Sequence, residues 1–568
     1  MPANTINRLL DQLDELKREF GGGQEQRIES SLSRVARQKF NNAESLIRFH
    51  EILLFIRAYP QTAKILHQAE KTLASFGDRV KLLRDTDADL SPLDNPEMSG
   101  IAGTSVTDTF TYNIVRWLWK LHPAQIAFAW DWFEDENRLA ATWPRFMPLL
   151  EEDAFVEANV SYVEWLRAAK GRGIRELAWL LQRFEALPLT DKEKVELYDS
   201  SKLYVRWTPS YKATRTGMKL PVREVYYHRQ PLIQRRDISL RDELESLPPS
   251  LKRLSARKGQ AILELTRETS TVRYRELYGF THGDVKRVFQ VSIGRGVDLF
   301  VIGLPSGLRL PLRAYHAAMI FKNGVPVGYF EGLSLFERME SGFNLYYSFR
   351  DGETAWIYAR TLNIFRHSLG VTAFSLDPYQ IGYENEEGIE SGAFWFYRKL
   401  GFRPTRTGLH ELTLAEERKM SGRRAYRTPK ALLRRLAAGP MIFELENSTV
   451  GNWDQFTARG IGLAVQRRMA GRFGGDAQKM RAASVEKVAR TLGVGAREWS
   501  EVELPALSDF AVMLDLISDL NRWSDSEKQA MVRIIRAKAG ADEARYLQLM
   551  QGHRRLRAAM IKLGSQVN

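Results

Sequence analysis

The segment 391–405, SGAFWFYRKLGFRPT, places Tyr397 four residues before a Gly-Phe pair. Two interpretations are open for it. The segment can be a buried aromatic helix that ends at an ordinary glycine C-cap. It can also be the last helix of a cofactor site, in which the Tyr397 phenol takes part in a reaction as a proton donor.

The elements before this segment are typical of an α/β domain. Apolar residues in residues 288–349 predict strands, and KNG at 322–324 lies between two alternating runs, which predicts a hairpin. The segment TAWIYARTLNIFRHSLG predicts a helix that ends at Gly370 as its C-cap. A buried strand VTAFSL, a polar loop and the helix of Tyr397 follow, and HELTLAEE is a candidate last strand. Upstream, KLYVRW and REVYYHRQPLI also read as strands.

Helical periodicity dominates both flanks of this unit. Apolar residues recur at three- and four-residue steps over much of 1–200, with a polar loop at about 82–110, and again after about 424. Seven tryptophans at 111–198 predict the core of a helix bundle. The sequence therefore predicts an α/β (α+β) domain at 201–424 between helical regions at 1–200 and 425–568.

The net charge of +14 is distributed unevenly along the chain. Residues 201–236 hold nine Lys and Arg against one acid, Glu224, which accounts for +8 of the total. This segment can be a solvated basic surface or an anion-binding site. Because Tyr204 and Trp207 are among the aromatics between these charges, nucleic-acid binding is a further alternative, although we find no RNA- or DNA-binding motif.

Several chemistries find no support in the sequence. The absence of Cys excludes disulfides, thiolate metal sites and cysteine nucleophiles. The sequence has no HExxH and no P-loop, and its nine His are scattered, so we expect no metal. The N-terminus is charged and amphipathic, unlike a secretory signal, and no apolar run approaches membrane-span length. We expect a cytoplasmic protein without a membrane partner and make no prediction of its oligomeric state.

The order of elements, together with the tyrosine motif, resembles the core of the GNAT superfamily of acyl-CoA N-acyltransferases. In that family the last core helix ends in Tyr-x-x-x-Gly-Phe, with a small residue four positions before the Tyr. Here these positions are Ala393, Tyr397, Gly401 and Phe402. The resemblance covers residues 314–405 well, the preceding hundred residues weakly and neither flank. It implies a mixed-sheet, GNAT-like acyl-CoA acyltransferase domain flanked by helical domains.

The resemblance also implies a co-substrate, acetyl-CoA or another acyl-CoA, bound where two parallel strands separate. Here these would be FNLYYSF and VTAFSL, with the pyrophosphate at the N-terminus of the helix between them. The implied cofactor-binding residues are Tyr347, Ser348, Phe349, Arg350, Gly352, Thr354 and Ala355. The loop RDGETA departs from the family's Gln/Arg-x-x-Gly-x-Gly/Ala, and Asp351 and Glu353 bring negative charge to the expected pyrophosphate site. A capped helix without a ligand is the alternative for this loop.

By the same resemblance, Tyr397 would be the general acid that reprotonates the leaving CoA thiolate. The attacking amine also needs a base, and our first choice is Glu331, followed by Glu340, Asp377 and Glu390. Because no Cys can form an acyl-enzyme, we expect direct attack of an amine acceptor, whose identity the sequence does not give. A GNAT-fold interaction scaffold that has lost CoA binding is the main alternative.

Overall fold

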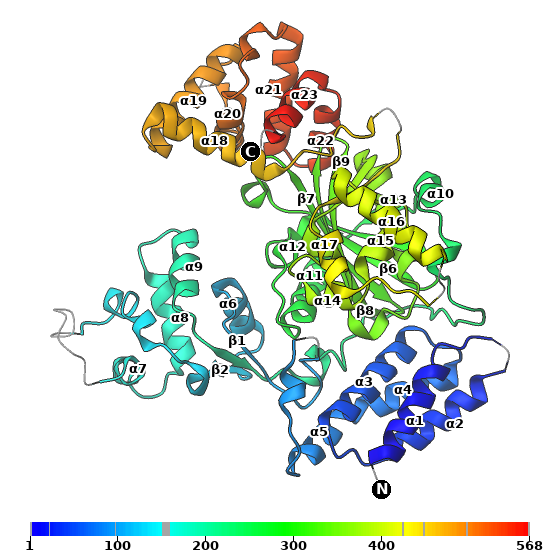
Figure 1. The fold of residues 1–568 in the computed structure, drawn as a ribbon. Coiled ribbons are helices and arrows are strands. Elements are labelled where there is room, and N and C mark those ends of the chain that lie inside the picture. The colour runs from blue at the N-terminus through cyan, green and yellow to red at the C-terminus, as the bar shows by residue number, and fades with distance from the viewer. Residues whose placement is uncertain are drawn as a thin grey trace.

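The computed structural model describes residues 3–21, 23–96, 98–149, 160–422, 425–446, 449–495 and 498–565. The chain folds into a mixed α/β centre, a helical N-terminal region packed against it, a lobe formed by residues 106–149 and 160–218, and a C-terminal helical region (Figure 1). No helix in these described ranges is long and apolar enough to cross a membrane.

The centre is built on a sheet that has nine strands in the described structure. These strands are β4 (Leu251–Arg253), β5 (Val288–Gly294), β6 (Val297–Ile302), β7 (Ala314–Lys322), β8 (Val325–Leu335), β9 (Arg338–Leu345), β10 (Ala373–Leu376), β11 (Arg403–Pro404) and β12 (Met441–Glu444). Their spatial order is β11-β12-β10-β9-β8-β7-β6-β5-β4. Of the pairs described, β9 with β10 is parallel and the others are antiparallel.

Two local predictions in this centre are confirmed. Strands β7 and β8 form an antiparallel hairpin whose two turn residues, Asn323 and Gly324, have φ angles of +49° and +79°. Such angles are typical of the tight turn that an Asn-Gly pair forms. Helix α13 (Thr354–Leu369) ends at Gly370, whose φ of +71° is the left-handed C-cap expected there. The helix is the crossover that a parallel strand pair requires.

Helices α1 (Ala3–Leu16), α2 (Glu25–Ala36), α3 (Ala43–Ala58), α4 (Ala63–Ala74) and α5 (Phe76–Arg84) form the N-terminal region. Nearly all of α3 is buried. Its apolar residues belong to the same continuous hydrophobic core as those of the central sheet. These helices therefore pack directly against the centre and share its hydrophobic core.

The lobe has a hydrophobic core of its own. It contains β1 (Val106–Asp108), β2 (Ile126–Phe128), β3 (Val205–Trp207), α6 (Tyr112–Leu121), α7 (Tyr162–Lys170), α8 (Glu176–Ala186) and α9 (Asp191–Ser200). Trp143 and Trp207 are fully buried in it, as expected for core tryptophans. The predicted helix bundle is corrected in one respect, because a three-stranded sheet in the order β1-β3-β2 completes this core.

Two predicted strands are wrong. HELTLAEE lies in α16 (Thr407–Gly422), since its Leu, Ala and Glu residues are strong helix formers. The strand that pairs with β10 on this side of the sheet is β12, beyond the predicted boundary at 424, and β11 lies at the edge. REVYYHRQPLI does not form a strand, and its backbone bonds to other groups: the N–H of His228 donates to the Pro60 carbonyl (2.8 Å), and that of Tyr226 to the Asn323 side chain (2.8 Å).

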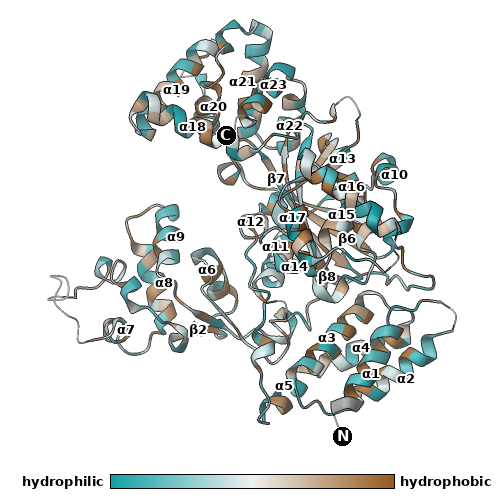
Figure 2. Ribbon diagram, viewed as in Figure 1, coloured by the Kyte–Doolittle hydropathy of each residue, from teal (hydrophilic) through white to brown (hydrophobic). Residues whose placement is uncertain are grey.

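The remaining helices of the centre are α10 (Leu240–Glu245), α11 (Ala256–Thr271), α12 (Tyr278–Thr281), α14 (Glu386–Glu390), α15 (Ala393–Arg398) and α17 (Lys430–Leu436). The C-terminal region consists of α18 (Ala458–Phe473), α19 (Ala477–Leu492), α20 (Leu504–Leu514), α21 (Asp525–Ala539), α22 (Glu543–Gln551) and α23 (Arg554–Gly564). Hydrophilic residues are frequent along α18 and α19 (Figure 2).

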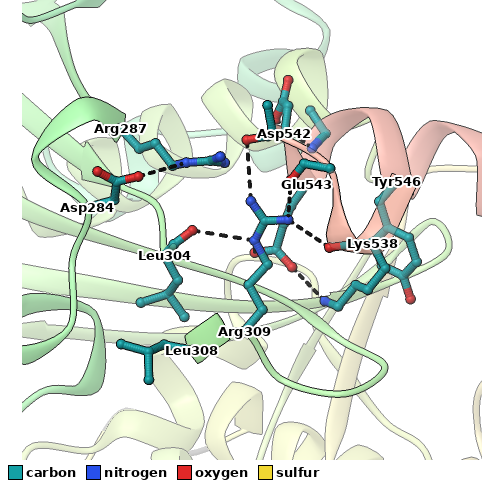
Figure 3. A network of polar contacts seen from close by, with 12 residues as sticks. Asp284, Arg287, Leu304, Leu308, Arg309, Lys538, Asp542, Glu543 and Tyr546 are labelled. Carbon is teal, nitrogen blue, oxygen red and sulfur yellow. Dashed lines mark hydrogen bonds and ion pairs between the residues drawn. The ribbon is translucent and has the colours of Figure 1, made fainter. Parts of the chain in front are cut away.

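A buried polar network joins the C-terminal region to the loop between β6 and β7 (Figure 3). The Arg309 guanidinium donates to the carbonyls of Lys538 (2.7 Å) and Gly540 (2.8 Å). The Lys538 ammonium lies 2.6 Å from a Glu543 carboxylate oxygen, with both side chains 4% exposed, and also donates to the Arg313 carbonyl. The network satisfies carbonyls at the end of α21 and fixes the C-terminal region to the sheet.

This network yields a prediction about stability. Glu543→Gln leaves the buried Lys538 ammonium without its counter-charge, so unfolding free energy should fall by about 3–5 kcal/mol. Urea unfolding measures the loss, and hydrogen exchange should show it first in α21 and α22. The control is Glu486→Gln, because Glu486 pairs with Arg490 on an exposed face, where a pair contributes at most about 1 kcal/mol. Equal losses in the two variants would contradict the role given to the network.

Candidate functional site

The parallel strands β9 and β10 separate shortly after they meet. They are paired only from Arg338 to Glu340 on β9, and β9 then continues to Leu345 along β8 alone. The outer edge of β9 at 341–345 therefore has no strand partner among the described residues. Two of its carbonyls are satisfied by side chains, since the Gln380 amide donates to the Phe343 carbonyl (2.8 Å) and the Arg350 guanidinium to the Leu345 carbonyl (3.2 Å). Gln380 belongs to the 3-10 helix η11 (Pro378–Ile381).

A cavity of about 790 Å³ lies where the strands separate. Its walls are the middle of β8, the end of β9, the loop before α13, the first turn of α13, and parts of η11, α14 and α15. Residues 232–235 and Arg18 of the loop after α1 close it from the side. This volume is within the range of small-molecule sites, which is about 300–1,000 Å³.

Tyr397 reaches this cavity from α15. Its ring is 3% exposed, and its hydroxyl accepts a hydrogen bond from the Gln380 amide (3.1 Å). Burial raises the pKa of the Tyr397 phenol above its ordinary value, while the bond from Gln380 acts in the opposite direction. The phenol is therefore protonated at neutral pH and can donate. The same Gln380 amide donates to the Phe343 carbonyl on the open edge of β9 and to the Tyr397 hydroxyl, so it links Tyr397 to that edge.

Glu331, on β8, also lines the cavity. Its carboxylate accepts a short hydrogen bond from the Tyr315 hydroxyl, which itself accepts one from the Gly279 N–H (3.0 Å). Burial raises the pKa of Glu331, and the bond from Tyr315 opposes that rise. A carboxylate with a raised pKa is suited to accept a proton at neutral pH.

The other three acids considered as bases are engaged elsewhere. Glu340 lies 3.5 Å from Arg313, and Glu390 lies 3.0 Å from Lys430. Asp377 caps η11 by accepting from the Tyr379 N–H (2.9 Å). Glu331 is thus the only one of the four candidate bases that the structure brings to the cavity with Tyr397.

Only some of the residues expected to bind a cofactor lie at the cavity. Arg350, Gly352, Thr354 and Ala355 line the cavity. The other three do not: Tyr347 is 55% exposed, and Ser348 and Phe349 are buried in the core. Ser348 donates a short hydrogen bond to Glu51 of α3, which is a structural contact.

Both acids of the RDGETA loop are neutralised by distant residues. Glu353 is fully buried, 2.5 Å from Arg295 and 3.5 Å from Lys322. Burial lowers the pKa of Lys322 to about 7, and the charge of Glu353 opposes this. Asp351 lies 3.3 Å from Lys17, at the end of α1. The expected negative charge at this site is therefore compensated, and the N-terminus of α13 remains suited to an anion.

Tyr59, which follows α3, holds the same loop in place. Its hydroxyl accepts from the Glu353 N–H (3.4 Å), and a Cβ on Gly352 would overlap the Tyr59 ring and hydroxyl. Gly352 is therefore required because an N-terminal side chain approaches the backbone closely, and its φ angle is not in the left-handed region.

The basic segment 201–236 does not form one continuous surface. Arg215 is buried against Glu51 (2.9 Å), and Lys219 pairs with Glu70 (2.5 Å). Trp207, one of the aromatics expected to stack on bases, is fully buried. Of the nine basic residues in this segment, Arg235 is the one that lines the cavity as the structure describes it. These positions favour structural roles for much of the segment.

Comparisons with known proteins add no family to these observations. Protein-family models, curated proteins and solved structures were searched, and none matches the chain. Within the described ranges, no group of three or more His, Asp and Glu side chains is placed to hold a metal ion.

The two loop acids should respond differently to neutralisation. Glu353→Gln leaves Arg295 and Lys322 without their buried counter-charge, so the free energy of unfolding should fall by about 3–5 kcal/mol. Asp351→Asn alters a partly exposed pair and should cost at most about 1 kcal/mol. Urea unfolding of both variants measures the difference. Similar small losses would show that Glu353 is not the buried anchor of the loop.

Proposed function

We propose that this protein is an acyl-CoA-dependent N-acyltransferase with a GNAT-like central domain. The observation that carries the proposal is the separation of β9 from β10 over a cavity that Tyr397, Glu331 and the first turn of α13 share. An acyl thioester with a long amide-bearing arm and a diphosphate matches this combination of an open strand edge and a helix N-terminus.

The binding roles follow from the positions of the groups. The backbone groups of β9 at 341–345 that do not already accept from Gln380 or Arg350 would pair with the amides of the pantetheine arm. The first-turn N–H groups of α13, together with Arg350, would bind the pyrophosphate. Arg18 and Arg235 add positive charge to the same cavity. The thioester would then lie near Tyr397, beyond the point where β10 ends.

The reaction we propose is direct transfer. The acceptor nitrogen attacks the thioester carbonyl carbon, and Glu331 takes a proton from that nitrogen. The carbon–sulfur bond then breaks, and the sulfur receives the proton of the Tyr397 hydroxyl. Gln380 orients that hydroxyl through its 3.1 Å hydrogen bond. The products are an amide and free CoA, and no covalent acyl-enzyme is needed.

Calorimetric titration with acetyl-CoA tests the proposal. We expect saturable binding, and in Tyr397→Phe we expect kcat to fall about 100-fold while the acetyl-CoA affinity stays nearly unchanged, because general acid catalysis contributes about 10²–10⁴-fold. Turnover is measured by release of free CoA thiol with a mixture of amines.

Two outcomes would contradict this assignment. If millimolar acetyl-CoA did not bind, the acyltransferase proposal would be rejected. The alternative, a non-catalytic interaction scaffold of the same fold, would then remain. Equal losses of affinity and turnover in Tyr397→Phe would make Tyr397 a structural residue. Tyr358→Phe is the matched control for the loss of a buried hydroxyl, since the Tyr358 hydroxyl bonds to Ser341 in the core (2.9 Å).

The base should impose a pH dependence. Burial raises the pKa of Glu331, and only the ionised carboxylate accepts a proton, so kcat/KM should fall as the pH drops through this raised value. In Glu331→Gln this limb of the profile should disappear and the plateau rate should fall. The measurement is kcat/KM against pH for both proteins. A variant that retained the acid limb would show that another group is the base.

A further inference from the structure

The register of β7 and β8 determines which side chains lie next to Glu331. Ala317 is directly opposite Glu331, and Tyr315 is two residues from Ala317 on the same strand. Because residues two apart on a strand point to one face of the sheet, Tyr315 is a diagonal neighbour of Glu331. Aromatic side chains can span that diagonal separation. The Tyr315 hydroxyl does so and donates its short hydrogen bond to the Glu331 carboxylate.

The small helix α12 covers this pair of side chains. The N–H of Gly279 in α12 donates to the Tyr315 hydroxyl oxygen (3.0 Å). It is one of the first N–H groups of the helix, which have no partner within the helix. A Cβ on Gly279 would lie 2.5 Å from the Ala317 Cβ and 2.8 Å from Cε1 of the Tyr315 ring. A glycine is therefore required here for the backbone of α12 to approach the sheet this closely.

Helix α12 is held in turn by α11. The Arg267 guanidinium, on α11, donates to the carbonyls of Phe280 (2.8 Å) and Thr281 (2.9 Å) at the end of α12. A helix of four residues has little stability of its own, so such external bonds decide its position. A continuous series of hydrogen bonds thus connects α11, through α12 and Tyr315, to the carboxylate of Glu331.

These bonds use the hydrogen-bonding capacity of the Tyr315 hydroxyl in a fixed direction. A phenol has one proton, which is donated to Glu331, and its oxygen accepts from the Gly279 N–H. The residue is 4% exposed, so water has little access to either bond. The arrangement restricts the carboxylate of Glu331 to one position at the cavity wall.

Several charged or titratable groups belong to the elements around Glu331. They are Tyr315 on β7, Tyr329 on β8, Glu340 on β9, Arg275 and His282 on either side of α12, and Arg267 on α11. Of these, Tyr315 is the one that hydrogen-bonds to Glu331 in the described structure. Tyr329 accepts from Arg275 (3.1 Å), and Glu340 lies 3.5 Å from Arg313. The orientation of the Glu331 carboxylate therefore depends on Tyr315.

We propose that Tyr315 is a positioning residue for the base of the proposed reaction, and that α12 holds it in place through the Gly279 N–H. This inference deepens the proposed function and rests on it. Tyr315 is not one of the described residues that line the cavity, so it acts through Glu331, which takes the proton of the acceptor nitrogen. Burial raises the pKa of Glu331, and the bond from Tyr315 limits that rise.

The pH dependence of kcat/KM in Tyr315→Phe tests this role, measured by thiol release with acetyl-CoA and the mixture of amines. Without the bond the pKa of Glu331 should rise further, so the acid limb should move to higher pH. The plateau should fall about 10- to 100-fold, because a misplacement of about 1 Å can cost about 100-fold in rate. The limb itself should remain, unlike in Glu331→Gln, because the carboxylate is still present.

Tyr278→Phe is the matched control. Tyr278 belongs to α12 and its ring contacts that of Tyr315 edge-on, with the ring centres 5.8 Å apart. It is 38% exposed, and its hydroxyl donates to the Leu308 carbonyl (2.7 Å) and not to Glu331. The acid limb of this variant should coincide with that of the unsubstituted protein.

Gly279→Ala tests the part played by α12 and keeps the Tyr315 hydroxyl. The added Cβ would overlap Ala317 and the Tyr315 ring, so α12 should move and its N–H should leave the hydroxyl. A hydroxyl that no longer accepts from an N–H is a weaker donor, because linked hydrogen bonds strengthen one another. The acid limb should therefore move in the same direction as in Tyr315→Phe, by less. Circular dichroism and unfolding midpoints establish that each variant is folded.

A second readout needs no turnover. Titration of the glutamate side-chain carboxyls by ¹³C NMR, with the Glu331 signal assigned by its loss in Glu331→Gln, follows this carboxyl in the protein without acetyl-CoA. The pKa of Glu331 should be higher in Tyr315→Phe than in the unsubstituted protein, and unchanged in Tyr278→Phe.

The outcomes separate this inference from the proposed function. If acetyl-CoA is turned over and neither Tyr315→Phe nor Gly279→Ala moves the acid limb, the positioning role is overturned and the acyltransferase stands. An equal movement of the limb in Tyr278→Phe would also overturn it, since any loosening of α12 would then suffice. If acetyl-CoA does not bind, the proposed function fails, and the positioning role in its reaction fails with it, whatever the carboxyl titration shows.

Discussion

The early end of β10 is the constraint on which the candidate site depends. Strand β10 stops at Leu376 because Asp377 and Pro378 start the 3-10 helix η11, and proline has no N–H to continue a ladder. Meanwhile β10 is fully paired on its other side, from Ala373 to Leu376, by β12. It therefore cannot follow β9 further, and the edge of β9 opens. The residues of η11 then provide Gln380, the side chain that joins this edge to Tyr397.

A second condition is that the negative charges of the loop before α13 are neutralised by residues from other parts of the chain. Glu353 is acceptable in the interior because Arg295 and Lys322, which flank the ends of β6 and β7, surround it. The N-terminal region adds Lys17 against Asp351 and Tyr59 against Gly352. The shape and charge of the cavity thus require helices α1 and α3 as well as the sheet. This explains why the N-terminal helices share the core of the centre.

The sequence predicts those parts of the fold whose signals are local. The Asn323-Gly324 turn, the helix that ends at Gly370 and the helix of Tyr397 each depend on neighbouring residues, and each forms. Strand β12 lies beyond the predicted boundary at 424, because it follows two helices and is recognised only by its pairing with β10. From the sequence, the acids of the RDGETA loop seemed unfavourable for a pyrophosphate site. The basic residues that neutralise them are distant in the sequence, so no local spacing pattern could reveal the pairing.

One residue of the site that the sequence did not mark has this property. Gln380 carries no motif, and its role comes from a strand that ends early at the start of η11. Only the assembled structure shows that its amide reaches both the Phe343 carbonyl and the Tyr397 hydroxyl.

Burial has the same effect on the pKa of the two titratable groups of the site, to which the proposed reaction gives opposite roles. Burial raises the pKa of both the Tyr397 phenol and the Glu331 carboxyl, because a low-dielectric environment disfavours each charged form. For the phenol, whose ordinary pKa is already high, the result is a group that keeps its proton at neutral pH and can donate it as charge develops on the leaving sulfur in the proposed reaction. For the carboxyl, the result is a more basic oxygen. The proton donor and the proton acceptor of the proposed reaction therefore line one cavity.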